Sequence, residues 1–216
     1  MFHSKKDTVY VVLAGIFITN AIVAELIGGK LIDVGSAVMS IGILPWPIVF
    51  VTTDLINEYF GEKGVRKLSF ITAGLIAYTF FILYFAMQIP STGISSVTSE
   101  QFNAVFGQSQ LIIVGSIIAF LASQLIDVTI FHFVKRRTGN KMIWLRSTGS
   151  TVISQFFDSF IVLGIAFWLP DIMDTKTYII SGLTGYTVKL VIAVGMTPFI
   201  YLGHYLIQKY IAKDGQ

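Results

Sequence analysis

Six long apolar stretches occupy most of this 216-residue chain, and each could cross a lipid bilayer as a helix, which takes roughly 20 mostly apolar residues. To within several residues, they are 8–28, 38–60, 68–89, 111–133, 148–169 and 178–207. Only 12% of the residues are charged, about half of the share in a soluble domain, and the mean hydropathy is +0.76. We therefore expect an all-α integral membrane protein, with six transmembrane helices in one compact bundle that forms a single domain over residues 1–216.

Prolines fall inside two of these stretches. The triplet Pro45-Trp46-Pro47 lies in the second stretch, and Pro198 lies in the last. Because proline lacks a backbone N–H and clashes with the preceding helical turn, both helices are expected to kink or break. Interrupted helices expose backbone groups that can bind polar ligands at membrane depth.

Lysine and arginine gather at the two termini and in alternate connections between the stretches. The rule that basic residues stay on the cytoplasmic side then predicts that both termini are cytoplasmic. The connection 90–110 on the opposite side has no basic residue, and its Phe102, Val105 and Phe106 indicate a short interfacial helix. The residues counted on the cytoplasmic side are Lys5, Lys6, Lys63, Arg66, Lys67, Lys135, Arg136, Arg137, Lys141, Arg146, Lys209 and Lys213.

Polar side chains lie inside three of the apolar stretches. A charge at bilayer depth costs a few kcal/mol, so such a residue ordinarily has a partner or a function. Residues three and four apart share a helix face, and the rise of 1.5 Å per residue puts these groups in one layer of the membrane, about 12–18 Å from the nearest basic residue. The candidate substrate-binding residues are Asp54, Asn57, Glu58, Gln124, Asp127, Ser154, Gln155 and Asp158.

This polar layer predicts a pocket for a small ligand rich in N–H donors, because ionised carboxylates only accept hydrogen bonds, whereas amides donate and accept. A flat heteroaromatic base fits, since a carboxylate can bind a guanine-like edge and an aromatic ring can stack on the base. Tyr59, Phe156 and Phe157 lie beside the polar groups and are candidates for stacking. Two alternatives remain open: polar pairs that only hold the helices together, and a proton relay.

One pattern occurs twice. Ser123-Gln124-x-x-Asp127 and Ser154-Gln155-x-x-Asp158 lie on consecutive stretches that are expected to run in opposite directions. Five residues are weak evidence for an internal duplication, but they place the same side-chain chemistry on both helices.

Charged residues in the stretches also suggest two pairs. Glu25 and Lys189, both expected toward the outer side, are candidates for a buried ion pair with a structural or gating role. Asp54 and Glu58 are one helical turn apart and would repel each other if both were ionised. One of them is expected to hold a proton, unless a basic residue of the following connection neutralises Glu58.

The composition also argues against several functions. Without cysteine the chain cannot form a disulfide, a thiolate or a cysteine-based metal site, and its three histidines are scattered. Because no histidine is expected at membrane depth, we expect no intramembrane enzyme and hence no catalytic residue, metal or cofactor.

Three segments resemble the YhhQ family of queuosine precursor transporters, also grouped as vitamin uptake transporters. They are Asp54-Leu55-Ile56-Asn57-Glu58-Tyr59-Phe60-Gly61, the first Ser-Gln-x-x-Asp pattern, and Arg146-Ser147-Thr148-Gly149-Ser150-Thr151 leading into the second. The resemblance covers nearly the whole chain in length, number of spans and order of motifs. It implies uptake of 7-cyano-7-deazaguanine or 7-aminomethyl-7-deazaguanine across the bacterial cytoplasmic (inner) membrane, for queuosine modification of tRNA. The partners implied are this deazapurine and the lipid bilayer, with no nucleic acid.

The alternative is a substrate-binding subunit of an energy-coupling-factor transporter, which docks on a separate ATPase module. Small residues four apart on the first span would favour it, but Ala21 and Ala24 have a different spacing. The resemblance to the YhhQ family also implies that the chain acts without an ATPase subunit. The preferred deazapurine, the coupling ion and a possible homo-oligomer remain open.

Overall fold

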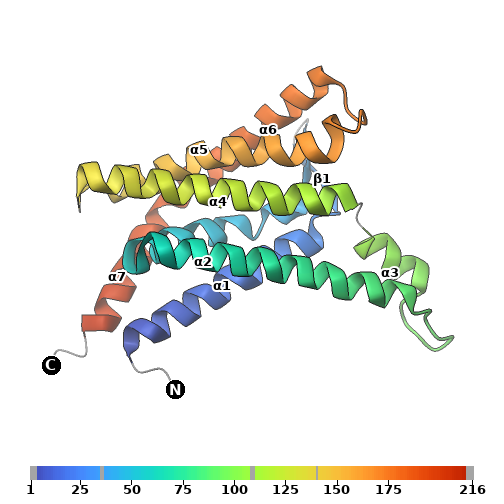
Figure 1. Ribbon diagram of the computed structural model, residues 1–216, viewed down its shortest axis with the longest axis horizontal. Helices are drawn as coiled ribbons and strands as arrows, with labels where there is room; N and C mark the ends of the chain where they lie inside the picture. Colours follow the sequence, from blue (N-terminus) through green and yellow to red (C-terminus); the bar gives the residue numbers. More distant parts are fainter. Residues whose placement is uncertain (1–3, 35–36, 108–109, 140, 213–216) are drawn as a thin grey trace.

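The computed structural model describes residues 4–34, 37–107, 110–139 and 141–212, and helices make up most of it (Figure 1). A short antiparallel hairpin, β1 (Leu31–Val34) and β2 (Ala37–Ser40), and a 3₁₀ turn, η1 (Ile41–Ile43), follow the first helix. A π-helical turn, η2 (Gly164–Trp168), extends α5. The helices are α1 (Lys5–Ile27), α2 (Trp46–Gln88), α3 (Ser99–Phe106), α4 (Gln110–Thr138), α5 (Ile143–Leu163), α6 (Thr175–Gly195) and α7 (Thr197–Ala212).

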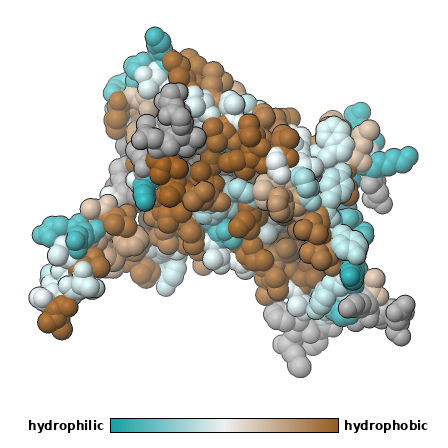
Figure 2. All heavy atoms as spheres, turned by 180° about the vertical axis from the view of Figure 1, so that it is seen from behind, coloured by the Kyte–Doolittle hydropathy of each residue, from teal (hydrophilic) through white to brown (hydrophobic). Residues whose placement is uncertain are grey.

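The helices have the length and surface of a multi-pass membrane protein. Among the described residues, five helical segments are long and apolar enough to cross a membrane. Figure 2 shows hydrophobic residues over the middle of the molecule and hydrophilic residues toward its extremities. The segments are Lys5–Ile27, Ile41–Gln88, Ile112–Thr138, Ile143–Trp168 and Thr175–Gly195.

α2 combines two of the expected spans. Its backbone leaves the helical conformation at Gly61, which has φ 74° and ψ 180°, and glycine reaches this region at little cost because it has no Cβ. Figure 1 shows the arms before and after this residue running in opposite directions. The arms correspond to the expected spans 38–60 and 68–89. The first arm begins later than expected, because residues 38–40 belong to β2 and 41–43 to η1.

The prolines mark helix starts. Pro45 is the N-cap of α2 and Pro47 lies in its first turn, where a missing N–H costs nothing. The expected interruption of the stretch 38–60 at this triplet is therefore found, since η1 ends at Ile43 and α2 begins at Trp46. The expected interruption near Pro198 is confirmed, since α6 ends at Gly195 and α7 begins at Thr197. The expected short helix in the connection 90–110 is also confirmed as α3.

The apolar core lies among α1, both arms of α2 and α4. Phe17 of α1, Ile56 and Val65 of α2, and Phe120 of α4 are fully buried in one cluster. α4 packs along α5, and α5 packs on α6. The polar side chains are consequently gathered where the first arm of α2 meets α4 and α5.

Basic segments collect at one end of the molecule. Figure 1 places both chain termini, the reversal within α2 and the connection from α4 to α5 at the same end. The β-hairpin, α3 and the connection from α5 to α6 lie at the other end.

Candidate functional site

Seven of the eight candidate binding residues are buried, and Glu58 is partly buried. They come from the first arm of α2, the middle of α4 and the middle of α5, as the polar layer predicted. These residues do not line a single pocket; their contacts divide them among neighbouring clusters.

The two Ser-Gln-x-x-Asp patterns bind each other. Ser123 Oγ of α4 donates to Asp158 Oδ1 of α5 at 3.4 Å, and Ser154 Oγ of α5 donates to Asp127 Oδ1 of α4 at 3.3 Å. Thr151 Oγ1 adds a second hydrogen bond to Asp127 Oδ1, also at 3.3 Å. The repeated pattern thus joins two antiparallel helices through reciprocal contacts, so the interhelical role is real for both serines.

A cavity lined by polar residues, the polar cavity, lies between α2, α4 and α5, next to the hydrogen bond from Ser154 to Asp127. Two acceptors on its lining residues, Gln124 Oε1 and Asp127 Oδ2, are buried without a hydrogen-bond partner in the described part of the chain. Leaving such an acceptor unpaired costs about 1–3 kcal/mol, so the arrangement favours a ligand that supplies donors. The cavity has room for about one water molecule, so a ring-sized ligand requires the helices to move apart. Its lining is Phe50, Thr53, Ser123, Gln124, Asp127, Thr151, Ser154 and Gln155.

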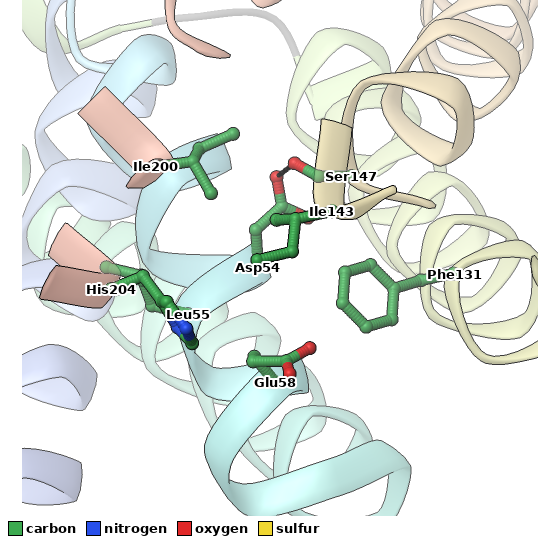
Figure 3. Close-up of a pocket in the computed structure, with 8 residues that line it drawn as sticks. All are labelled: Asp54, Leu55, Glu58, Phe131, Ile143, Ser147, Ile200 and His204. Atoms are coloured by element: carbon green, nitrogen blue, oxygen red, sulfur yellow. Dashed lines mark hydrogen bonds between the residues drawn. The ribbon is translucent and has the colours of Figure 1, made fainter. Parts of the chain in front are cut away.

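Asp54 lines a second cavity, separate from the polar cavity, which we call the Asp54 cavity. Figure 3 shows Asp54 and Ser147 pointing toward each other, with Ser147 Oγ donating to Asp54 Oδ2. The other oxygen, Asp54 Oδ1, is buried and has no hydrogen-bond partner among the described residues. The lining of this cavity is Asp54, Leu55, Glu58, Phe131, Ile143, Ser147, Ile200 and His204.

Glu58 is neutralised from two helices. Its Oε2 lies 2.8 Å from Arg146 Nη2 and 3.1 Å from Lys135 Nζ. Arg146 is 1% exposed and also donates from Nη1 to the carbonyl oxygen of Gly139 at 2.8 Å. The neutralising charges therefore come from α4 and α5, whereas Arg66, in the second arm of α2, pairs with Glu62. Arg146, which the sequence analysis counted with the loop charges, is a buried residue of α5.

Asn57 is buried next to α4. Its Oδ1 lies 3.3 Å from His132 Nε2, while its Nδ2 has no hydrogen-bond partner in the ranges that the structure describes. Asn57 is not among the residues that line either of these two cavities.

A third group of polar residues, the Lys189 cluster, consists of Glu25, Ser116, Ser123, Asp158 and Lys189. Lys189 Nζ of α6 lies 2.5 Å from Asp158 Oδ2, and Ser116 Oγ of α4 donates to Glu25 Oε2 of α1 at 2.5 Å. The ion-pair partner of Lys189 is thus Asp158, where Glu25 was expected, although the charges of Asp158 and Lys189 both act on Glu25. The cluster ties α1, α4, α5 and α6 together.

The predicted stacking residues do not reach the polar cavity. Phe156 and Phe157 are 40% and 43% exposed, and Phe156 packs on Tyr186 of α6. They follow Gln155 directly, so the helix turns them away from the face that carries it. Tyr59 instead donates its hydroxyl to the carbonyl oxygen of His204 at 3.1 Å. The aromatic side chain that lines the cavity is Phe50.

The sequence analysis named neither Phe50, Thr53 and Thr151 nor the charged partners Lys135 and Arg146 as site residues. A usable signal was present on α5, where polar residues recur three and four apart along one face over its whole length. This buried face comprises Ser147, Ser150, Thr151, Ser154, Gln155 and Asp158.

Comparison with known proteins gives a consistent picture. Residues 40–203 match the family described as "Putative vitamin uptake transporter". A Bacillus subtilis (strain 168) protein named "Probable queuosine precursor transporter" is 27% identical over 182 residues, which cover 82% of this chain and 77% of that protein. A Haemophilus influenzae protein of the same name is 27% identical over 157 residues, covering 71% of this chain and 63% of that protein. No solved structure matches.

Proposed function

Because the chain belongs to the vitamin uptake transporter family, we propose that it imports a queuosine precursor of the 7-deazaguanine class across the bacterial cytoplasmic membrane. The names of the Bacillus subtilis and Haemophilus influenzae relatives support this substrate. The observation that carries the proposal is the pair of buried acceptors, Gln124 Oε1 and Asp127 Oδ2, which lie at one cavity and have no hydrogen-bond partner among the described residues. The protein acts as a transporter, with no catalytic step and no ATPase subunit.

The substrate-binding groups belong to the polar cavity. Asp127 accepts the N1–H and 2-amino hydrogens of the deazaguanine edge, which are the paired donors that a carboxylate takes. The amides of Gln124 and Gln155 bind the remaining polar atoms of the ring, and Phe50 stacks on its face. Ser154 and Thr151 already donate to Asp127 Oδ1, so they orient this carboxylate toward the substrate.

Transport requires that the three helices separate and close again, because the cavity holds about one water molecule. Asp158 and Glu58 belong to the ion pairs that hold α5 to α6 and α2 to α4 and α5. These pairs are the contacts that change when the cavity opens, so both residues control access rather than touch the substrate.

The topology that fits this function has six crossings, with both termini in the cytoplasm. The segment Ile41–Gln88 has 48 residues, or roughly 70 Å of straight helix, about twice what one crossing needs. Its two arms, divided at Gly61, therefore make separate crossings. The basic termini and connections gather at one end of the molecule, which favours this end as the cytoplasmic side (Figure 1).

The proposal is tested by binding of 7-cyano-7-deazaguanine to the purified protein in lipid nanodiscs. Adenine should compete at least about a hundredfold more weakly, because it presents a bare acceptor where the deazaguanine presents N1–H, and the carboxylate would stay unpaired. Asp127→Asn should lose this discrimination. Asp171→Asn, a change in the exposed connection between α5 and α6, is the matched control and should bind like the wild type. Equal competition by adenine would exclude this recognition.

A transport assay completes the test. A bacterial strain that lacks both precursor synthesis and its own importer should regain queuosine in its tRNA at nanomolar precursor when it expresses this chain. Failure of both binding and complementation by well-folded protein would overturn the proposed function.

A further inference from the structure

The buried carboxylates at membrane depth differ in how their charge is balanced. Glu58 has two cationic partners, Arg146 and Lys135, and Asp158 has Lys189. Asp54 and Asp127 have no cation within ion-pair distance in the part of the chain that the structure describes. Each of them also keeps one buried oxygen without a hydrogen-bond partner there.

Two isolated ionised carboxylates in a low-dielectric interior are expensive, and an unpaired buried group ordinarily becomes neutral instead. The negative charges of Asp127 and Asp54 also act on each other, which adds to this cost. One proton on the pair removes the mutual repulsion and one of the two buried charges. The question is therefore which of the two carboxyl groups holds it.

The contacts favour Asp54 as the protonated member. Asp127 Oδ1 accepts hydrogen bonds from two hydroxyl groups, and its free oxygen is available to the substrate. Among the described residues, Asp54 receives one hydrogen bond, from Ser147, and it lines the Asp54 cavity, not the polar cavity. The ionised form of Asp127 is thus better stabilised than that of Asp54.

Charged and titratable groups surround Asp54 on several helices. Glu58 follows on α2, Asp127 faces it from α4, and Arg146 acts on it from α5. His204 of α7 lines the same cavity, but its Nδ1 is bonded to Tyr59 and its Nε2 to Gln208. Arg146 is engaged by Glu58 and by the backbone, so it does not form an ion pair with Asp54.

We propose that Asp54 carries a proton that is transported together with the substrate, which makes the importer a proton symporter. This inference rests on the proposed function. The proton binds a carboxylate oxygen of Asp54 when the site faces outward and leaves it to water when the site faces the cytoplasm. A neutral substrate that covers ionised Asp127 excludes water from the region, so a second negative charge beside it becomes costlier. Substrate and proton therefore bind cooperatively, and each raises the affinity for the other.

The first experiment measures proton uptake on binding. 7-Cyano-7-deazaguanine, which is neutral, is titrated into the purified protein in nanodiscs by calorimetry, in two buffers of different ionisation enthalpy. The wild type should take up close to one proton per substrate in a pH range where Asp54 is ionised without substrate. Asp54→Asn should bind the substrate with no proton uptake. Glu62→Gln, which changes a partly exposed carboxylate just after the reversal at Gly61, is the matched control and should retain the uptake.

The second experiment measures transport in proteoliposomes. A pH gradient with the acid side outside should accumulate the neutral substrate about tenfold per pH unit for one proton. Asp54→Asn should lose this accumulation and keep substrate exchange at equal pH, which also reports that the variant is folded. Ser147→Ala removes the hydrogen bond from Ser147 to ionised Asp54, and it should move the pH midpoint of accumulation upward.

The outcomes separate the two claims. Exchange without pH-driven accumulation or proton uptake would leave the proposed function standing and overturn the coupling. Accumulation driven by sodium alone would also overturn it. If His204→Gln abolishes the proton uptake while Asp54→Asn keeps it, the proton lies on His204 and the assignment is wrong. Absence of both binding and exchange in the wild type would instead refute the proposed function.

Discussion

Ser123 Oγ lies 3.4 Å from Asp158 Oδ1, so the serine of one Ser-Gln-x-x-Asp pattern binds the aspartate of the other. The reciprocal bond, from Ser154 to Asp127, completes the arrangement. The two halves nevertheless differ in charge, because Asp158 has Lys189 as an ion-pair partner and Asp127 has no cation in ion-pair contact among the described residues. This difference predicts that the same substitution impairs substrate binding at one aspartate and stability at the other.

Asp127→Asn should impair substrate binding and leave the fold intact. The asparagine can keep an oxygen for Ser154 and Thr151, but its NH₂ group meets the donor edge of a deazaguanine, where the carboxylate had accepted. Losing a charge-assisted pair of hydrogen bonds costs about 1.5–3 kcal/mol, or roughly 10- to 150-fold in affinity. Nanodisc binding and thermal unfolding check the two halves of this prediction. Wild-type affinity at matched folding would assign Asp127 to helix packing alone.

Asp158→Asn should instead lower the stability, because it leaves the Lys189 ammonium without its ion partner. Breaking a buried pair costs about 3–5 kcal/mol, and the partial exposure of both side chains reduces this to roughly 1–3 kcal/mol. Lys189→Met in the Asp158→Asn background should recover part of the loss. The free energies of unfolding of the single and double variants form a double-mutant cycle. Additive effects in this cycle would mean that the pair is not coupled.

The buried guanidinium of Arg146 makes a third prediction possible. Arg146→Met should destabilise the protein by about 3–5 kcal/mol, since Glu58 loses its closest cation and the carbonyl of Gly139 loses a donor. Glu58→Gln should restore part of this stability in the double variant. Arg137→Gln, which changes an exposed residue of α4, is the control and should stay within about 0.5 kcal/mol of the wild type. Unfolding monitored by circular dichroism in detergent measures all three. Equal stability of the Arg146 and Arg137 variants would contradict the buried ion pair.

Much of the helical architecture and of the polar layer could be predicted from the sequence. Membrane helices require long apolar runs, and polar residues three and four apart must share a face, so composition and spacing place Gln124, Asp127 and Asp158 inside the protein. The hairpin before α2 could not be predicted in this way, because an apolar run such as 38–45 suits a strand as well as a helix. Sequence position also misled at Arg146, which is close to a connection and yet buried.

The partners of each polar group depend on how helices distant in the sequence pack. The sequence indicates that Lys189 and Glu58 need counter-charges. Their partners are Asp158 and Arg146 because α5 packs against α6 and α2. The prediction of which aromatic residues line the cavity was wrong for the same reason. Phe156 and Phe157 are neighbours of Gln155 in sequence, whereas Phe50 comes to the cavity from another helix.

The close approach of α6 to α5 gives the last prediction. A Cβ added to Gly182 would lie 2.7 Å and 2.9 Å from ring atoms of Phe160, closer than non-bonded carbon atoms come. Gly182→Ala should therefore destabilise the protein by about 1–3 kcal/mol, as overpacking does. The clash should push α6 away from α5. Since α6 also carries Lys189, this movement should weaken the contact of Lys189 with Asp158.

Gly185 of the same helix is the matched control, because a Cβ there meets nothing within 4 Å. Gly185→Ala should be neutral, or stabilising by up to about 1 kcal/mol through helix propensity. Phe160→Leu should relieve the Gly182→Ala clash in the double variant, since leucine lacks the ring edge that the new methyl group would contact. Thermal unfolding of the four proteins decides the point: equal effects of alanine at 182 and 185 would show that α5 and α6 are not in such close contact.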